Sequence, residues 1–116
     1  MVFSTRFAKK AVLAALASMA LVASPALFGQ GAETGEALFK RNCAGCHGPD
    51  GSGQTAMGRS FKLQDLRSAD VQKMTDAQLA DMIAKGKGKM PTYGARLNPG
   101  QIQSVVGYLR ELAGKK

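Results

Sequence analysis

The sequence predicts an all-α fold of three or four short helices joined by long glycine-rich connections. Two observations indicate helices. Residues 75–78 and 98–101 are each typical of a capped helix start, and the apolar residues that follow them recur at helical spacing. The third observation is that no stretch alternates apolar and polar residues for long enough to predict a sheet. No internal repeat divides the chain, so a single small domain is expected.

The first helix is expected over residues 33–42, where Leu38 and Phe39 provide an apolar face. Residues 45–59 are predicted to be a loop because five glycines interrupt them. Residues 65–74 are ambiguous and allow a helical turn or two. The first part of the domain is therefore expected to hold one clear helix.

The next helix is expected to begin at a capping box formed by Thr75 and Gln78 and to run to about Lys85. Gly86 and Gly88 follow and end it. One face of this helix is apolar and is predicted to pack in the core; it consists of Leu79, Met82 and Ile83.

The last helix has the strongest start signal in the chain. Asn98 is suited to the cap, Pro99 to the first helical position, and Gln101 stands three residues after the cap. Gly114 closes the helix. Its apolar stripe at helical spacing predicts a long core helix and consists of Ile102, Val105, Val106, Leu109 and Leu112.

Residues 1–31 have the layout of a secretory signal peptide. Three basic residues stand among the first ten, an apolar run follows over residues 11–23, and a proline and several small residues come next. The run of 13 residues is shorter than the roughly 20 needed to span a bilayer. An uncleaved membrane anchor stays an alternative because the run can be extended to Phe28. We expect cleavage at about residues 26–31, which leaves a soluble periplasmic domain over residues 32–116.

Composition excludes several classes of protein. Hydrophobic residues make up 45% and charged residues 21% of the chain, which is typical of a folded domain and not of a disordered tail. Two cysteines and one histidine are too few for a four-ligand zinc site or a disulfide-rich scaffold. Aromatic residues make up only 6% and tryptophan is missing. A small domain this poor in aromatic bulk is expected to need a cofactor to complete its core.

The high net charge does not indicate a nucleic-acid partner. The formal charge of +8 falls to +5 over residues 32–116, because three of the sixteen bases and none of the eight acids precede them. The remaining lysines are not interleaved with aromatic residues, and export would separate the protein from nucleic acid. Part of the apparent basicity is therefore attributed to the export signal.

Both cysteines and the only histidine lie within residues 43–47, which read Cys-Ala-Gly-Cys-His. This spacing is the attachment signature of c-type haem. Cys43 and Cys46 would each form a thioether with one haem vinyl group, because two intervening residues in a helical turn separate the sulfurs by about the vinyl separation. His47 follows directly and can reach the iron from the same side. The sequence therefore predicts one covalently attached haem c.

Three other interpretations of the cysteine pair compete with haem attachment. A thioredoxin-like redox pair would follow a strand and open a helix, whereas this motif follows a predicted helix and no strand is predicted. A structural disulfide suits an exported protein but leaves His47 without a role. A zinc half-site would need ligands from a second chain. Haem attachment accounts for all three residues together.

A sixth ligand for the iron is sought among the methionines, whose soft thioether suits a haem iron. Met90 lies beyond a helix end in a loop stiffened by Pro91, 43 residues after His47 and thus far enough to pass round a haem. Met57 is too close to the attachment motif, and Met82 is assigned to the core. The alternative for Met90 is an exposed loop methionine without a role.

From Gly35 to about Leu112 the chain resembles the class I cytochromes c, the small monohaem bacterial type. The resemblance rests on three separated pieces in the right order. They are Gly35-x-x-x-Phe39 ahead of Cys43-Ala44-Gly45-Cys46-His47-Gly48, then Leu79-x-x-x-Ile83-x-x-Gly86-x-x-x-Met90-Pro91-x-Tyr93, and finally Val105-x-x-Tyr108-Leu109.

The resemblance implies a cytochrome c-like domain wrapped around a covalently bound haem, with His47 and Met90 as the axial ligands of the iron. It also implies that the first and last helices cross closely. Gly35 would allow their backbones to approach, and Phe39 would pack near Tyr108.

The chain departs from the class at the haem propionates. Many relatives carry a tryptophan that touches the haem or its propionates, and this chain has none. Arg59, Gln54 or Tyr93 would have to replace that contact. Tyr93 also stands where relatives often have phenylalanine, which is a mild change.

Iron with both axial positions filled leaves no site for a substrate, so the resemblance implies a periplasmic one-electron carrier and not an enzyme. The alternative is a cytochrome c subunit or module of a larger oxidase or dehydrogenase complex. A ligand-binding or peroxidatic haem protein would need Met90 to be off the iron.

The lysines around Met90 suggest how a redox partner docks. Lys85, Lys87 and Lys89 precede it, with no acid between Asp81 and Glu111. Clustered charge raises the rate of encounter with an oppositely charged surface, so an acidic docking patch is expected on the partner. A solvated charge run without a partner is the alternative. Contact with a membrane is expected only through such partners.

Overall fold

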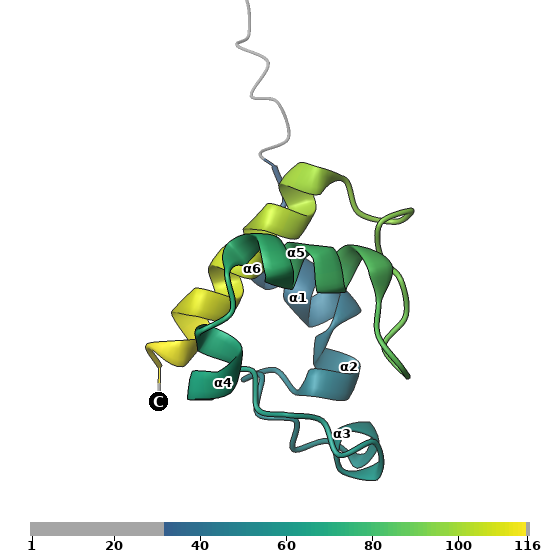
Figure 1. The fold of residues 1–116 in the computed structure, drawn as a ribbon, viewed down its shortest axis with the longest axis vertical. Coiled ribbons are helices and arrows are strands. Elements are labelled where there is room, and N and C mark those ends of the chain that lie inside the picture. Colours follow the sequence, from purple (N-terminus) through teal and green to yellow (C-terminus); the bar gives the residue numbers. More distant parts are fainter. Residues whose placement is uncertain (1–31, 116) are drawn as a thin grey trace, which may run out of the picture.

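The computed structural model describes residues 32–115, and this part of the chain is helical without any named strand (Figure 1). The predicted all-α class is confirmed. The proposed leader, residues 1–31, lies outside the described residues. The six helices of the described part are α1 (Gly35–Asn42), α2 (Ala44–His47), α3 (Ala56–Ser60), α4 (Ala69–Gln72), α5 (Asp76–Lys85) and α6 (Pro99–Ala113).

Figure 1 shows α1, α5 and α6 gathered together, with α2, α3 and α4 arranged along the other side of the domain. Helices α1 and α5 both pack against α6, while α2 contacts both α1 and α3. The buried apolar residues come mainly from the three longer helices: Leu38, Phe39, Val71, Leu79, Ile83, Tyr93, Leu97, Ile102, Val105, Val106, Tyr108, Leu109 and Leu112.

Helices α1 and α6 cross as closely as the resemblance implied. A Cβ placed on Gly35 would lie 2.6 Å from the carbonyl carbon of Ser104, so only glycine fits at this approach. One turn further along α1, the ring of Phe39 packs against that of Tyr108 with centroids 5.4 Å apart and planes tilted by 56°. Tilted aromatic pairs at this separation add to the energy of burial.

The two predicted helix starts are confirmed. At α5, Gln78 N–H donates to the Thr75 hydroxyl at 3.1 Å and Thr75 N–H donates to the Gln78 side chain at 2.9 Å. Asn98 and Gln101 form the same reciprocal pair at α6, with Pro99 in the first turn. Each pair satisfies two backbone donors that a helix start would otherwise leave open.

The expected loop over residues 45–59 is wrong in two places, because it contains most of α2 and most of α3. Thr55 is the reason for α3: its hydroxyl accepts from Gly58 N–H at 2.8 Å and donates to the Cys46 carbonyl at 2.6 Å. One side chain thus caps α3 and ties it to α2. The ambiguous stretch over residues 65–74 holds the single turn α4, capped by Ser68.

Arg110 ties α6 to the segment that joins α4 to α5. Its guanidinium donates to the carbonyls of Gln72 at 3.0 Å and Met74 at 2.6 Å, and it pairs with Asp76 at 2.8 Å. The Gln72 side chain in turn donates to the Leu109 carbonyl at 3.2 Å. These bonds satisfy backbone carbonyls where the chain turns between short helices.

Candidate haem-binding cavity

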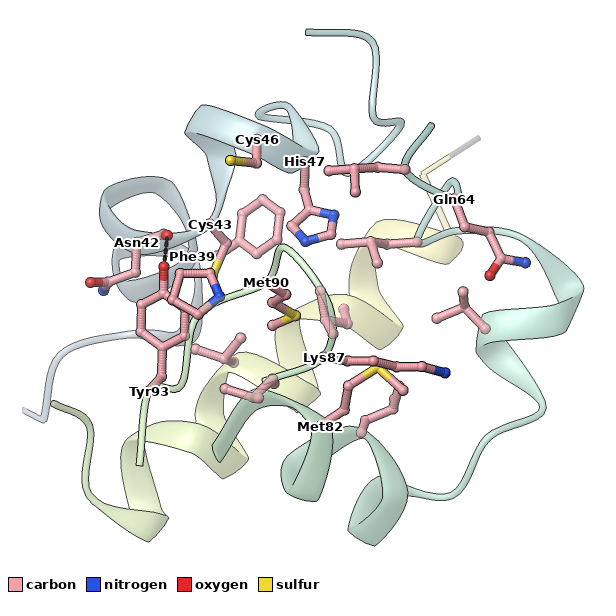
Figure 2. A pocket seen from close by; sticks show the side chains of 18 of the residues that line it. Phe39, Asn42, Cys43, Cys46, His47, Gln64, Met82, Lys87, Met90 and Tyr93 are labelled. Atoms are coloured by element: carbon pink, nitrogen blue, oxygen red, sulfur yellow. Dashed lines mark hydrogen bonds between the residues drawn. The ribbon is translucent and has the colours of Figure 1, made fainter. Parts of the chain in front are cut away.

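A cavity of about 480 Å³ opens between the two groups of helices (Figure 2). This volume falls within the range of about 300–1,000 Å³ that is usual for cofactor and small-molecule sites. Its walls are mainly apolar and come from α1, α2, α4, α5, α6 and three connecting segments. The lining residues are Phe39, Asn42, Cys43, Cys46, His47, Phe61, Lys62, Leu63, Gln64, Leu66, Val71, Met74, Leu79, Met82, Ile83, Lys87, Lys89, Met90, Pro91, Tyr93, Val105 and Leu109.

The attachment motif forms its own helical turn at one wall of the cavity. Cys43 ends α1 and caps α2, and its carbonyl accepts from His47 N–H at 2.9 Å. Residues three and four apart on a helix share a face. Cys43, Cys46 and His47 accordingly all line the cavity, as Figure 2 shows.

The competing interpretations of the cysteine pair find no support in the described residues. Both cysteines are free, so there is no disulfide within this part of the chain. No strand precedes the motif, as a thioredoxin-like site would require. No group of three or more histidine, cysteine, aspartate or glutamate residues within residues 32–115 could hold a metal ion.

The environment of His47 favours a neutral imidazole. Its Nδ1 is buried and has no hydrogen-bond partner among the described residues, although buried polar atoms nearly always have one. Burial lowers the pKa of the imidazole and so favours the neutral form, which is the form that binds metal. Burial also raises the pKa of the Cys43 thiol to about 11, with a smaller contribution from Cys46. The chemistry of this donor set fits a haem held by two thioethers and an imidazole.

Met90 enters the cavity from the loop after α5, on a different segment from the attachment motif (Figure 2). Gly86 ends α5 with a φ of 72°, and a Cβ there would lie 2.5 Å from the Met90 carbonyl oxygen. Lys87 and Met90 then exchange two backbone hydrogen bonds of 3.1 and 2.9 Å in an isolated antiparallel bridge. Glycine at position 86 and this tight turn fix where the Met90 side chain projects.

The other methionines lie in three different environments. Met57 is 45% exposed and does not line the cavity, which agrees with its exclusion as a ligand. Met74 lines the cavity and packs against the core. The assignment of Met82 to the core is wrong, because this side chain is only half-buried and lines the cavity instead. It stands on the side of α5 that faces the cavity, beside the buried Leu79 and Ile83, which also line it.

The polar residues at the cavity differ from those expected for the propionates. Arg59 and Gln54 do not line the cavity, whereas Lys62 and Gln64 do. Lys62 has a φ of 54°, which is unusual for a residue other than glycine, and no sequence pattern indicated it. Tyr93 lines the cavity as expected, but its hydroxyl donates to the Asn42 carbonyl at 2.9 Å. Burial raises the pKa of Tyr93, with a smaller contribution from Cys43.

The lysines expected near Met90 divide into two groups. Lys87 and Lys89 line the cavity, and the ammonium of Lys89 lies 5.8 Å from the centre of the exposed Phe61 ring. Lys85 does not line it and pairs with Asp81 at 2.6 Å on the outer side of α5. Lys62, from the loop after α3, also lines the cavity.

A helical domain around an apolar cavity, with a Cys-x-x-Cys-His turn at one wall, defines a c-type cytochrome. Residues 30–109 match the family described as cytochrome c oxidase, cbb3-type, subunit III, and the chain belongs to this family of cytochrome c domains. The resemblance to the class I cytochromes c is confirmed, and the cofactor of the chain is covalently attached haem c.

Relatives of two kinds are similar to the chain. It is 37% identical to cytochrome c6 of Leptolyngbya boryana over 84 residues, which cover 72% of this chain and 95% of that protein. It is 35% identical to the cbb3-type cytochrome c oxidase subunit FixP of Bradyrhizobium diazoefficiens over 96 residues. That match covers 79% of this chain but only 31% of FixP, so the chain spans about a third of that relative.

A solved structure supports the fold. The KustC0563 c-type cytochrome superposes with a TM-score of 0.64 at 26% identity, covering 69% of this chain and 98% of that one. Together these relatives make the chain a cytochrome c electron carrier. Within residues 32–115 no helix has the length and apolar character needed to cross a membrane.

Proposed function

We propose that this chain is a one-electron carrier that holds its haem through Cys43 and Cys46 and the haem iron through His47 and Met90. The observation that carries the proposal is the meeting of two distant segments at one apolar cavity. The attachment motif forms one wall, and Met90, 43 residues beyond His47, enters from the loop after α5. The haem would supply the one-electron chemistry, and ligation by a soft thioether and an imidazole would favour a high potential.

The residues around the cavity have two tasks in this function. The apolar lining, which includes Leu79, Ile83 and Val105, keeps water away from the iron and so limits the reorganisation that accompanies a change of its charge. If His47 and Met90 both bind the iron, no position on the iron would be open to a substrate. We therefore propose that the chain transfers electrons between proteins and is not itself an enzyme.

Covalent attachment is tested by extraction. Haem should stay with the denatured holoprotein in acid acetone, and the pyridine haemochrome spectrum should be that of two thioethers. Cys43→Ala should leave one thioether at most. Haem that extracts freely from the unaltered chain would exclude attachment through this motif.

The axial ligand is tested against the two other methionines of the cavity. Met90→Ala should abolish the near-infrared sulfur-to-iron band and open a site for carbon monoxide. Met74→Ala and Met82→Ala remove the rival thioethers that line the cavity and should keep the band. Met57→Ala, at a position outside the cavity lining, is the surface control. Loss of the band in one of these three variants would reassign the ligand.

Docking is proposed at the side of the domain where the cavity opens, because Lys62, Lys87 and Lys89 are among the residues that line the cavity. Charge on the route to the haem raises the rate of encounter, while exposed ion pairs are weak enough to let the partners separate. The complementary surface is an acidic patch on the redox partner. Lys85 takes a smaller part because Asp81 neutralises it.

A charge-matched comparison tests this docking site. Lys87→Gln/Lys89→Gln should slow bimolecular electron transfer and flatten its dependence on ionic strength, with the haem spectrum unchanged. The control Lys40→Gln/Lys73→Gln removes the same charge at two exposed lysines that do not line the cavity. Equal effects of the two double variants would make docking a matter of net charge alone.

We further propose that residues 1–31 direct export and that the domain acts as a soluble carrier in the periplasm. The match to cytochrome c6 over 95% of that protein favours a free carrier. The matches to FixP and to subunit III of cbb3-type oxidases favour the second candidate, a cytochrome c subunit or module of a larger oxidase complex. N-terminal sequencing of the exported protein, followed by size-exclusion chromatography of a native extract, separates the two: a free carrier elutes at its own mass.

A further inference from the structure

One hydrogen bond joins the two segments that meet at the cavity. The Tyr93 hydroxyl donates to the backbone carbonyl of Asn42 at 2.9 Å, across 51 positions of sequence. Asn42 immediately precedes Cys43, and Tyr93 stands three residues after Met90. Figure 2 shows this bond beside the cavity. It therefore links the backbone next to the attachment motif to the loop that carries Met90.

Tyr93 is well placed to act as a fixed anchor. It is buried, with 9% of its surface exposed. Its N–H donates to the Ile83 carbonyl at 3.1 Å and its carbonyl accepts from Leu97 N–H at 2.8 Å. Backbone bonds on both sides hold the residue, so the direction of its hydroxyl is set by the fold.

The acceptor is equally well defined. Asn42 is the last residue of α1, and the final carbonyls of a helix have no partner within the helix. Tyr93 supplies that partner for Asn42. Among the hydrogen bonds of residues 32–115, no other joins residues 87–97 to residues 33–50. The bridge Lys87–Met90 and the bonds to α5 hold the loop to its own helix but not to the attachment side.

We propose that Tyr93 is a positioning residue whose hydroxyl holds the Met90 loop against the attachment segment and thereby keeps Met90 on the iron. The proposal rests on the proposed function, because it takes Met90 as the axial ligand. Movement of this loop away from the wall formed by α2 would take Met90 off the iron. The Tyr93–Asn42 bond opposes that movement at a point three residues from the ligand.

Tyr93→Phe is the sharpest perturbation, because it keeps the ring and its packing and removes only the hydroxyl. Imidazole binding to the ferric holoprotein reports how often Met90 leaves, since imidazole can bind only at a vacated position. Loss of one hydrogen bond of ordinary net strength in Tyr93→Phe should raise the rate of imidazole binding by about 2- to 10-fold over the wild type. The amides of residues 87–94 should lose hydrogen-exchange protection in parallel.

Tyr108→Phe is the matched control, since it deletes the same hydroxyl from the other tyrosine of the chain. Tyr108 is buried at the α1–α6 crossing and does not line the cavity. The Tyr108→Phe variant should keep the imidazole-binding rate and the hydrogen-exchange protection of the Met90 loop at wild-type values. Both variants should keep the sulfur-to-iron band.

Three results would overturn the proposal. One is a Tyr93→Phe protein that binds imidazole at the wild-type rate. Another is an equal rise of the imidazole-binding rate in Tyr93→Phe and Tyr108→Phe, in proportion to the loss of unfolding free energy in each. The Tyr93 hydroxyl would then only stabilise the fold. The third is a wild-type protein without the sulfur-to-iron band, which removes the Met90 assignment together with this inference. The first two leave that assignment intact, so the failures are distinguishable.

Discussion

Gly35→Ala is expected to disrupt the crossing of α1 and α6, on which the placement of the attachment motif depends. A Cβ at this position would lie 2.6 Å from the Ser104 carbonyl carbon and 3.1 Å from the Tyr108 Cβ. Contacts under 3.0 Å are essentially never seen for real Cβ atoms, and the obstructing atoms belong to backbone. The two helices must therefore separate, and the pair Phe39–Tyr108 separates with them.

The expected loss of stability follows from two opposing terms. Overpacking against backbone destabilises by about 3 kcal/mol, at the upper end of its usual range. Replacement of glycine by alanine in a helix returns at most about 1 kcal/mol. The net loss is thus about 2 kcal/mol. With a urea m-value of about 1 kcal/mol/M for so small a domain, the unfolding midpoint should fall by about 2 M.

Gly107→Ala provides the matched control on the same helix pair. Gly107 lies within α6, and a Cβ there would meet no atom within 4 Å. The same chemical change should therefore stabilise the protein, raising the midpoint by up to about 1 M. Urea titration of the haem-loaded proteins, followed by circular dichroism, measures both. A Gly35→Ala protein as stable as the wild type would refute the close crossing. A Gly107→Ala protein that loses as much stability as Gly35→Ala would refute the steric reasoning.

Three further predictions concern the cavity and its supports. Gly86→Ala should weaken or abolish the sulfur-to-iron band, because alanine is strained at a φ of 72° and its Cβ would lie 2.5 Å from the Met90 carbonyl oxygen. The control Gly88→Ala has open space around it, so it should keep the band and lose only about 1 kcal/mol of stability. Arg110→Met should lower the unfolding free energy by about 2–3 kcal/mol in a urea titration, since it leaves carbonyls between α4 and α5 without their charged donor. Replacing Cys43 and Cys46 by serine should yield a haem-free chain with little helical circular dichroism, because the cavity then has nothing to fill it; a native-like spectrum would contradict this.

Local signals made the helices and the attachment motif predictable from sequence. The capping boxes at Thr75 and Asn98 each involve residues three apart, and the cysteines and His47 lie within five positions. Such features involve only residues close together in sequence, so a pattern read along the sequence locates them. Helix α3 escaped prediction for the opposite reason, because the Thr55 cap is reinforced by the distant Cys46 carbonyl.

Residues placed by long-range packing were harder to assign. Helical spacing correctly put Met82 on the apolar face with Ile83, but the pattern cannot tell a face covered by protein from one that borders a cavity. The same limit applies to Lys62 and Gln64, which a loop brings to the cavity without any motif. Tyr93 appeared to be a mild replacement for phenylalanine, yet its hydroxyl makes a bond across 51 positions.

The two sides of the cavity therefore differ in how they are built. The attachment side is local: one turn of helix places Cys43, Cys46 and His47 on one face, and two thioethers would fix the haem there covalently. The Met90 side depends on the end of α5 at Gly86, on a two-bond bridge and on the hydroxyl of Tyr93, each worth little alone. The proposed ligation by Met90 would thus depend on several weak contacts, of which only the Tyr93–Asn42 bond is long-range. Substitutions that leave the haem in place can still change its sixth ligand, and through it the potential at which the chain carries an electron.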